Sequence, residues 1–198
     1  MKLVKTSIEY LDSSKGIKLI EQAGRTCYKS ESKITEDSAQ AFVKRLIKSG
    51  HDAMLEFGWL CYRVICDRGM SHCLVRHRLF SFAQESTQYC KYKNDLTFIE
   101  PCWINENDIN KKRWLTHLKK SEQCYLDMLK DGWTPQQARS VLPNSLKTEL
   151  CIAGNLREWR HFFKLRTSKY AQRQIRELAN LLLIDAKTRF EILFDKGI

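Results

Sequence analysis

The stretch GWLCYRVICD at residues 58–67 constrains the fold most, because it predicts a strand in a chain whose second half is mainly helical. It is rich in aromatic and β-branched residues with partial alternation, which is typical of a half-buried strand. Residues 107–131, in contrast, repeat their apolar positions at helical spacing. Since both patterns occur in one chain, we expect an α+β fold.

Further elements follow from the same reading. We expect strands at 2–10, 95–101 and 145–154, and helical segments at 13–28, 35–50, 68–78, 134–143, 155–166 and 170–194. The helix from Thr35 has an N-cap signal with acidic residues in its first turn, and Gly50 ends it. Asn155 followed by Glu158 resembles a capping box. No repeat, low-complexity segment or linker is visible, so 198 residues predict one domain over 1–198.

Composition narrows the class of protein. The chain is 43% hydrophobic with only three prolines, which indicates a globular protein. No apolar run approaches 18 residues, so we expect no membrane span and no membrane partner. The first 16 residues lack an apolar core and a small-residue cleavage site, so no signal peptide is indicated. We therefore expect a cytoplasmic protein.

Eight cysteines occur without any C-x-x-C pair. Zinc sites usually contain such close pairs, so the sequence predicts no metal site. Several cysteines lie inside apolar patterns, which favours reduced, mostly buried thiols.

The formal net charge of +11 favours an anionic partner, either nucleic acid or a phosphorylated small molecule. No zinc-finger spacing, RNP-like motif or continuous basic region supports nucleic-acid binding. The basic run KKRWLTHLKK at 111–120 is equally explained as a solvated helix face. Charge alone does not decide between the two partners.

The stretch VRHRLFSFAQESTQY at 75–89 concentrates hydrogen-bond donors beside apolar residues. Arg76, His77 and Arg78 are consecutive, so they cannot all point the same way from a helix. Arginine forks bind phosphate oxygens, and a histidine can donate or accept. This arrangement suits a ligand with a phosphate and a ring. No G-x-S-x-G elbow, Walker loop or G-x-G-x-x-G fingerprint is present, so a serine hydrolase, a P-loop NTPase and a Rossmann dehydrogenase are not supported.

Other polar residues have structural explanations when each is taken alone. His51 could be a structural histidine, Arg139 could be a surface residue, and Arg166 could be a cation favoured at a helix end.

Arg76–Arg78, seven residues and then Ser86 resemble the signature of flavin-dependent thymidylate synthases. The segments GHDAMLEF, DRGMSHCLVRHR, ARSVLP, NLREWRHFFKLR and AQRQIRE follow that family's order and approximate spacing. The resemblance extends from about residue 25 to 180. It implies a single-domain α+β fold with a mixed or antiparallel sheet flanked by helices.

The resemblance also implies an activity. Enzymes of this family carry FAD, use NADPH to reduce it, and transfer a one-carbon unit from 5,10-methylenetetrahydrofolate to dUMP to form dTMP. They are homotetramers with sites built between subunits, they need no cysteine nucleophile on the uracil ring, and nucleic acid is not a partner. The basic charge is consistent with these anionic ligands.

Site residues are carried over position by position. The catalytic residue would be Arg166, which favours ionised uracil. The resemblance implies FAD contacts at His51, Ala53, Arg76, His77, Arg78, Gln84, Asn155, Leu156, Arg157 and His161. It implies dUMP contacts at Cys73, Arg76, Gln84, Glu85, Ser86, Thr87, Gln88, Arg139 and Arg166, with Arg139 on the phosphate.

Several positions depart from the family pattern: Gln88 replaces an arginine beside the phosphate, Cys73 replaces glutamine or glutamate, Ala53 replaces a hydroxyl residue, and Phe57 and Tyr170 replace histidines. Losing a charge-assisted phosphate contact costs about 1.5–3 kcal/mol. One alternative is therefore a flavin-dependent one-carbon transferase acting on another pyrimidine nucleotide. A more distant alternative, based only on charge, is a non-catalytic nucleic-acid-binding protein.

Overall fold

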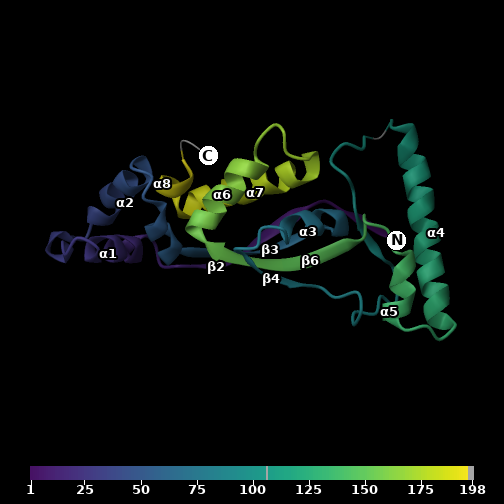
Figure 1. The fold of residues 1–198 in the computed structure, drawn as a ribbon. Coiled ribbons are helices and arrows are strands. Elements are labelled where there is room, and N and C mark those ends of the chain that lie inside the picture. The colour runs from purple at the N-terminus through teal and green to yellow at the C-terminus, as the bar shows by residue number, and fades with distance from the viewer. Residues whose placement is uncertain (106, 196–198) are drawn as a thin grey trace. The chain divides into compact units, whose positions relative to one another are not determined.

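A computed structural model describes residues 1–105 and 107–195 (Figure 1). The chain forms two compact units. Unit 1 contains Met1–Ser7, Val64–Arg76 and Ala83–Leu150. Unit 2 contains Ile8–Arg63, His77–Phe82 and the chain from Cys151 onward. The single domain expected over 1–198 stays a prediction, and residues 106 and 196–198 of that range lie outside the described residues.

The architecture is α+β, with an antiparallel sheet flanked by helices, as expected. The four-stranded sheet has the order β2-β3-β6-β4, and a separate pair joins β1 and β5 in parallel, with Leu3 opposite Phe98. The strands are β1 (Lys2–Val4), β2 (Ser7–Ser13), β3 (Trp59–Asp67), β4 (Ser81–Gln84), β5 (Thr97–Ile99) and β6 (Lys147–Asn155). Strands β2, β3, β4 and β6 each contribute residues to both units.

The two long strands bury every second residue, because successive side chains of a strand point to opposite faces. In β3 the buried positions include Leu60, Tyr62, Val64 and Cys66. In β6 they are Thr148, Leu150 and Ile152. Thr148 is the polar residue among these three, and its hydroxyl accepts a hydrogen bond from the Gln84 side chain.

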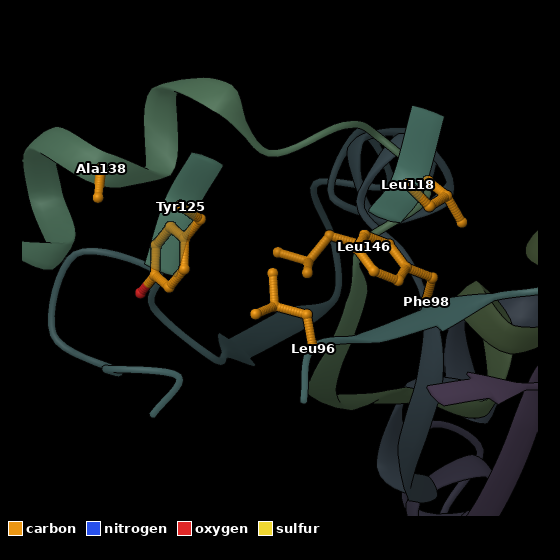
Figure 2. Packing of buried hydrophobic residues seen from close by; sticks show 6 residues of the cluster. All are labelled: Leu96, Phe98, Leu118, Tyr125, Ala138 and Leu146. Atoms are coloured by element: carbon orange, nitrogen blue, oxygen red, sulfur yellow. The ribbon is translucent and has the colours of Figure 1, made fainter. Parts of the chain in front are cut away.

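Unit 1 has its own hydrophobic core (Figure 2). The helices of this unit are α3 (Arg68–Leu74), α4 (Ile109–Lys130) and α5 (Pro135–Ala138), with a 3₁₀ turn η3 (Arg139–Val141) after α5. Figure 2 shows the core side chains, which come from α4, α5, β5 and the segments beside the strands: Leu96, Phe98, Leu118, Tyr125, Ala138 and Leu146. All are 1% exposed or less, so α4 is held to this unit by its apolar face.

Unit 2 is mainly helical. Its helices are α1 (Lys18–Thr26), α2 (Ser38–Lys48), α6 (Leu156–Arg166), α7 (Arg173–Arg189) and α8 (Glu191–Phe194), with 3₁₀ turns η1 (Glu31–Lys33) and η2 (Asp52–Phe57). Aromatic rings fill part of its core, where the Trp159 ring lies 4.5 Å from Phe80 and 5.7 Å from Phe162 between centroids. The indole N–H of Trp159 donates to the Leu60 carbonyl at 2.9 Å, so this ring is satisfied as well as buried.

Most of the expected elements are present, but several expectations about their limits were wrong. The strand expected at 2–10 is two strands, and β4 was not expected as a strand. Helix α2 begins at Ser38 after Asp37, because the Ser38 hydroxyl accepts from the Thr35 N–H and holds that segment in a turn. The helix expected at 134–143 is α5 followed by η3, and the one at 170–194 begins at Arg173 and breaks at Phe190, where φ is −140°.

No disulfide joins the eight cysteines, which all lie within the described residues, but the prediction that most are buried was wrong. Cys66 is buried, Cys27 and Cys90 are exposed, and the other five are partly exposed. Partial alternation placed them in strands and helices without fixing which face they occupy. Within residues 1–105 and 107–195, no helix is long and apolar enough to cross a membrane.

Candidate functional site

In unit 1, the predicted nucleotide residues gather at the end of β4 and in the turn after it. Gln84 is the last residue of β4, and its side-chain Nε2 donates to Ser71 Oγ at 2.9 Å and to Thr148 Oγ1 at 3.1 Å. The Ser71 hydroxyl donates to the Arg68 carbonyl at 2.8 Å, so its oxygen must accept from Gln84. The amide of Gln84 is therefore oriented, and its Oε1 is the atom left for a ligand.

Glu85 is held by a network that the sequence did not predict. Its Oε1 accepts from the Tyr92 hydroxyl at 2.7 Å, and its buried Oε2 lies 3.4 Å from Lys147 Nζ. Lys147 also pairs with Glu149. Burial alone would lower the pKa of Lys147, but the neighbouring carboxylates of Glu149 and Glu85 outweigh it and raise that pKa. The cation therefore stays charged beside Glu85.

Arg139, predicted to bind phosphate, lies beside the motif turn. Its Nη1 lies 3.4 Å from Thr87 Oγ1, to which it donates, although the two residues are 52 positions apart in the chain. Thr87 is buried and Arg139 is exposed, so the guanidinium is anchored on one side and open on the other. In the same turn, Ser86 Oγ accepts from the Gln88 N–H at 3.3 Å.

Two further predicted nucleotide residues lie on or just after α3. The helix is capped by Asp67, whose Oδ1 accepts from the Met70 N–H at 2.6 Å. Cys73, in the last turn, is partly exposed, and Arg76 is exposed after the helix ends. The structure therefore places both at the surface of unit 1.

In unit 2, the central residue of the motif is buried, and its side chain already has partners. His77 is 6% exposed, whereas Arg78 is exposed, which agrees with the expectation that the consecutive motif side chains do not point the same way. The His77 ring lies 5.1 Å from the Phe162 ring and 6.4 Å from the His161 ring.

His77 joins two charged residues of α6. Arg166 Nε donates to His77 Nε2 at 2.9 Å, and His77 Nδ1 lies 3.5 Å from Glu158 Oε1. Burial, followed by the positive charges of Arg166 and His161, lowers the pKa of His77 to about 4. Burial raises the pKa of Glu158, with His161 acting in the opposite direction. His77 is therefore neutral at neutral pH.

The start of α6 carries three of the predicted flavin residues. Asn155 caps the helix, because its Oδ1 accepts from the Glu158 N–H at 2.8 Å. The side chain of Leu156 is fully buried and packs against Gly58. Arg157 is exposed and forms an ion pair with Glu56 at 2.6 Å. Of the expected capping box, the hydrogen bond from the Glu158 N–H to Asn155 is present. The Glu158 carboxylate does not complete the box, because it lies beside His77.

The remaining predicted flavin residues of this unit are on its surface. His51 and Ala53 lie at the start of η2, and Arg78 and His161 are also exposed. The exposed set of unit 2 is rich in hydrogen-bond donors and cations, which fits a ligand that carries a pyrophosphate, such as FAD. Among the described residues, no group of three or more His, Cys, Asp or Glu side chains could hold a metal ion.

Sequence reasoning missed the partners of these residues. Glu158 lies three positions after the cap residue Asn155, and this spacing predicted a capping role for Glu158 rather than a contact with His77. Ser71, Thr148, Lys147 and Tyr92 carried none, because their contacts with Gln84 and Glu85 join separate strands and loops.

A protein-family model described as "Thymidylate synthase complementing protein" matches residues 8–190. A flavin-dependent thymidylate synthase of Pyrococcus abyssi is 32% identical over 164 residues, which are 81% of this chain and 67% of that protein. Flavin-dependent thymidylate synthases of Mycobacterium avium and Mycobacterium tuberculosis are 32% and 33% identical, each over 85% of this chain and 74% of its own length.

A solved structure also has this fold. The UMP/dUMP methylase PolB from Streptomyces cacaoi, bound with 5-Br dUMP, matches with a TM-score of 0.84 over 98% of this chain and 96% of its own. The sequence identity is 21%, so this similarity concerns the fold alone.

Proposed function

Since the chain belongs to the flavin-dependent thymidylate synthase family, we propose that it converts dUMP to dTMP. In this reaction 5,10-methylenetetrahydrofolate donates the one-carbon unit, FAD is the bound flavin and NADPH reduces it. The family is an enzyme family, and a flavin is its cofactor. The identity of the nucleotide, the folate and the reductant is the proposal.

The contact between Arg139 and Thr87 supports the nucleotide part best. The contact brings the arginine expected on the phosphate to the turn that contains Ser86 and Gln88. Because Thr87 engages one Nη group, the other donors of Arg139 are available for phosphate oxygens. The oriented amide of Gln84 adds an acceptor for an N–H or O–H group of the same nucleotide.

In unit 2, FAD would be held by Arg78, Arg157 and His161, which are exposed donors, together with the start of α6. When bound, the flavin supplies the redox chemistry of the reaction. Arg166 would stabilise negative charge on the pyrimidine, because a fixed cation beside developing charge lowers the barrier. In unit 1, Arg139 would hold the phosphate of the nucleotide.

A second candidate keeps the fold and the flavin but changes the nucleotide. Gln88 lacks the charge that the family places beside the phosphate, and a protein of the same fold is described as a methylase of UMP as well as dUMP. UMP or dCMP could then replace dUMP. A titration that follows the flavin absorbance during addition of dUMP, UMP or dCMP separates the two candidates. Preference for dUMP would eliminate the second.

The proposed function is tested by tritium release from C5-labelled dUMP with methylenetetrahydrofolate and NADPH. We expect a yellow purified protein that releases tritium only when both co-substrates are present. Colourless protein that FAD cannot reconstitute, or flavin-loaded protein without release, would rule out the dUMP reaction.

The same assay tests the role of Gln88. We expect Gln88→Arg to lower the KM for dUMP by roughly 10- to 150-fold, because a charge-assisted phosphate contact is worth about 1.5–3 kcal/mol. Gln123→Arg adds the same charge at an exposed position of α4 and should leave the KM unchanged. Equal effects of the two variants would show that net charge, rather than a local contact, governs nucleotide binding.

We also propose that the protein is a homotetramer, on the basis of the family resemblance, and that it acts in the cytoplasm, as expected from the sequence. Size-exclusion chromatography with light scattering should give four times the monomer mass, and a smaller mass would contradict the tetramer.

A further inference from the structure

Two buried polar side chains of unit 2, His77 and Glu158, have no part in the proposed reaction, and they adjoin Arg166, which is partly exposed. Arg166 Nε, His77 and Glu158 are connected through contacts of 2.9 Å and 3.5 Å. His77 is 6% exposed and Glu158 5% exposed, although a buried carboxylate is costly without a partner. These contacts lead from the Glu158 carboxylate through His77 to Arg166, the arginine expected to act on the substrate.

The direction of the hydrogen bond between Arg166 and His77 follows from the chemistry of the two groups. An arginine always donates, so His77 Nε2 must be the unprotonated nitrogen. The ring is neutral, as its lowered pKa of about 4 indicates, so its proton is on Nδ1. His77 Nδ1 lies 3.5 Å from Glu158 Oε1, so the carboxylate is placed to favour the tautomer with the proton on Nδ1.

We propose that His77, oriented by Glu158, is a positioning residue that holds the guanidinium of Arg166 through its Nε–H and leaves both terminal Nη groups for the pyrimidine. This inference rests on the proposed function, because Arg166 has its catalytic role only there. It differs from the role in flavin contact that the family resemblance gives to His77.

An arginine held at Nε has fewer orientations than one held by nothing, so less freedom is lost when its terminal groups bind a ligand. Misplacing a catalytic group by about 1 Å can cost on the order of 100-fold in rate. We therefore expect the loss of the His77 acceptor to reduce kcat more than it changes the affinity for FAD.

Two variants of His77 test this. His77→Phe keeps an aromatic ring in the cluster of Phe80 and Phe162 but removes the acceptor, and should lower kcat for tritium release by about 10- to 100-fold. His77→Gln keeps an acceptor near the Nε2 position and should recover most of that loss. His117→Phe, at an exposed position of α4, should match the unmodified protein. A His77→Phe effect confined to FAD affinity, with kcat unchanged at saturating FAD, would overturn the proposal.

A double-mutant cycle isolates the pair. If His77 acts through Arg166, adding His77→Phe to Arg166→Gln should cost little beyond Arg166→Gln alone. Additive losses from the two changes would overturn the proposal, because they would show that the residues act independently.

A measurement without activity separates this proposal from the proposed function. Nitrogen NMR of the histidine side chains should show His77 as the neutral Nδ1–H tautomer at pH 7. Among residues 1–105 and 107–195, the charged and titratable groups facing His77 are Arg166, His161 and Glu158, all on α6. Removing one positive charge by Arg166→Gln should therefore raise the pKa of His77. An unchanged pKa, or an Nε2–H tautomer, would refute the arrangement even in a protein with no activity on dUMP. Absent activity together with the expected tautomer would instead count against the proposed function.

Discussion

Replacing Gly154 with alanine should destabilise the protein by overpacking unit 2 at Phe80, whose ring lies 6.2 Å from the His77 ring. Gly154 lies near the end of β6, and its φ is outside the left-handed region, so alanine meets no backbone strain there. The added Cβ, however, would be 2.1 Å from Phe80 Cδ1 and 2.4 Å from Phe80 Cε1. Contacts this short require the ring or the strand to move.

The ring has little room to move. Phe80 is 7% exposed and is packed by Trp159, 4.5 Å away, and Phe162, 5.9 Å away, between ring centroids. Overpacking a close-packed core costs about 1–3 kcal/mol, and a rigid ring places this site at the upper end. The loss of backbone freedom in the unfolded chain returns about 0.4–1 kcal/mol. We expect a net loss of about 2 kcal/mol in the free energy of unfolding.

Thermal and urea unfolding measure this loss. For a chain of this size, about 2 kcal/mol corresponds to a Tm lower by roughly 4–8 °C. Phe80→Leu in both backgrounds is the control, because a smaller side chain at position 80 leaves space for the alanine. The cost of Gly154→Ala should then fall below about 1 kcal/mol. If Gly154→Ala costs the same with Phe80 and with leucine, the clash is not the cause and the reasoning fails.

Three other predictions concern the candidate site. Because the pKa of His77 is lowered from 6.5 to about 4 in the folded protein, its contribution to stability is complete above pH 6.5 and is lost as the pH falls toward 4. Glu158 acts in the opposite sense, because its pKa is raised. Comparing urea unfolding of the unmodified protein with that of His77→Phe isolates the contribution of His77. The difference between their free energies of unfolding should shrink as the pH falls from 6.5 toward 4. Arg157→Ala should change the free energy of unfolding by less than about 1 kcal/mol, because its ion pair is exposed, yet weaken FAD binding about tenfold in a flavin titration; unchanged binding would remove Arg157 from the flavin site. Ser71→Ala removes one acceptor of the Gln84 amide, so it should cost about 1 kcal/mol in stability and raise the KM for dUMP several-fold, and an unchanged KM would show that the orientation of this amide does not matter.

Local sequence patterns determined most of the secondary structure. Alternating apolar residues at 58–67 correspond to β3, and the helical periodicity of 107–131 corresponds to α4. Such patterns succeed because a strand or a helix must place its apolar side chains on one face to bury them. Asn155 was recognised as a cap for the same local reason, since a helix start leaves N–H groups that a nearby side chain can satisfy.

The family resemblance identified the candidate site residues, but not what holds them. Arg139 and Thr87 are 52 positions apart, and their contact within unit 1 is one that no local pattern encodes. Gln84 was named, but the hydroxyls of Ser71 and Thr148 that orient its amide come from α3 and β6.

The motif at 75–89 shows the division most clearly. From the sequence alone it was a row of donors that had to point in different directions, and an anionic ligand explained them. Only the tertiary structure decided that His77 is buried. Arg166 of α6 donates to its ring, and the Glu158 carboxylate lies 3.5 Å from it. The rings of Phe80 and Phe162 lie beside it. Burial and charge at a single residue depend on which distant segments pack against it, and that information appears only when the chain has folded.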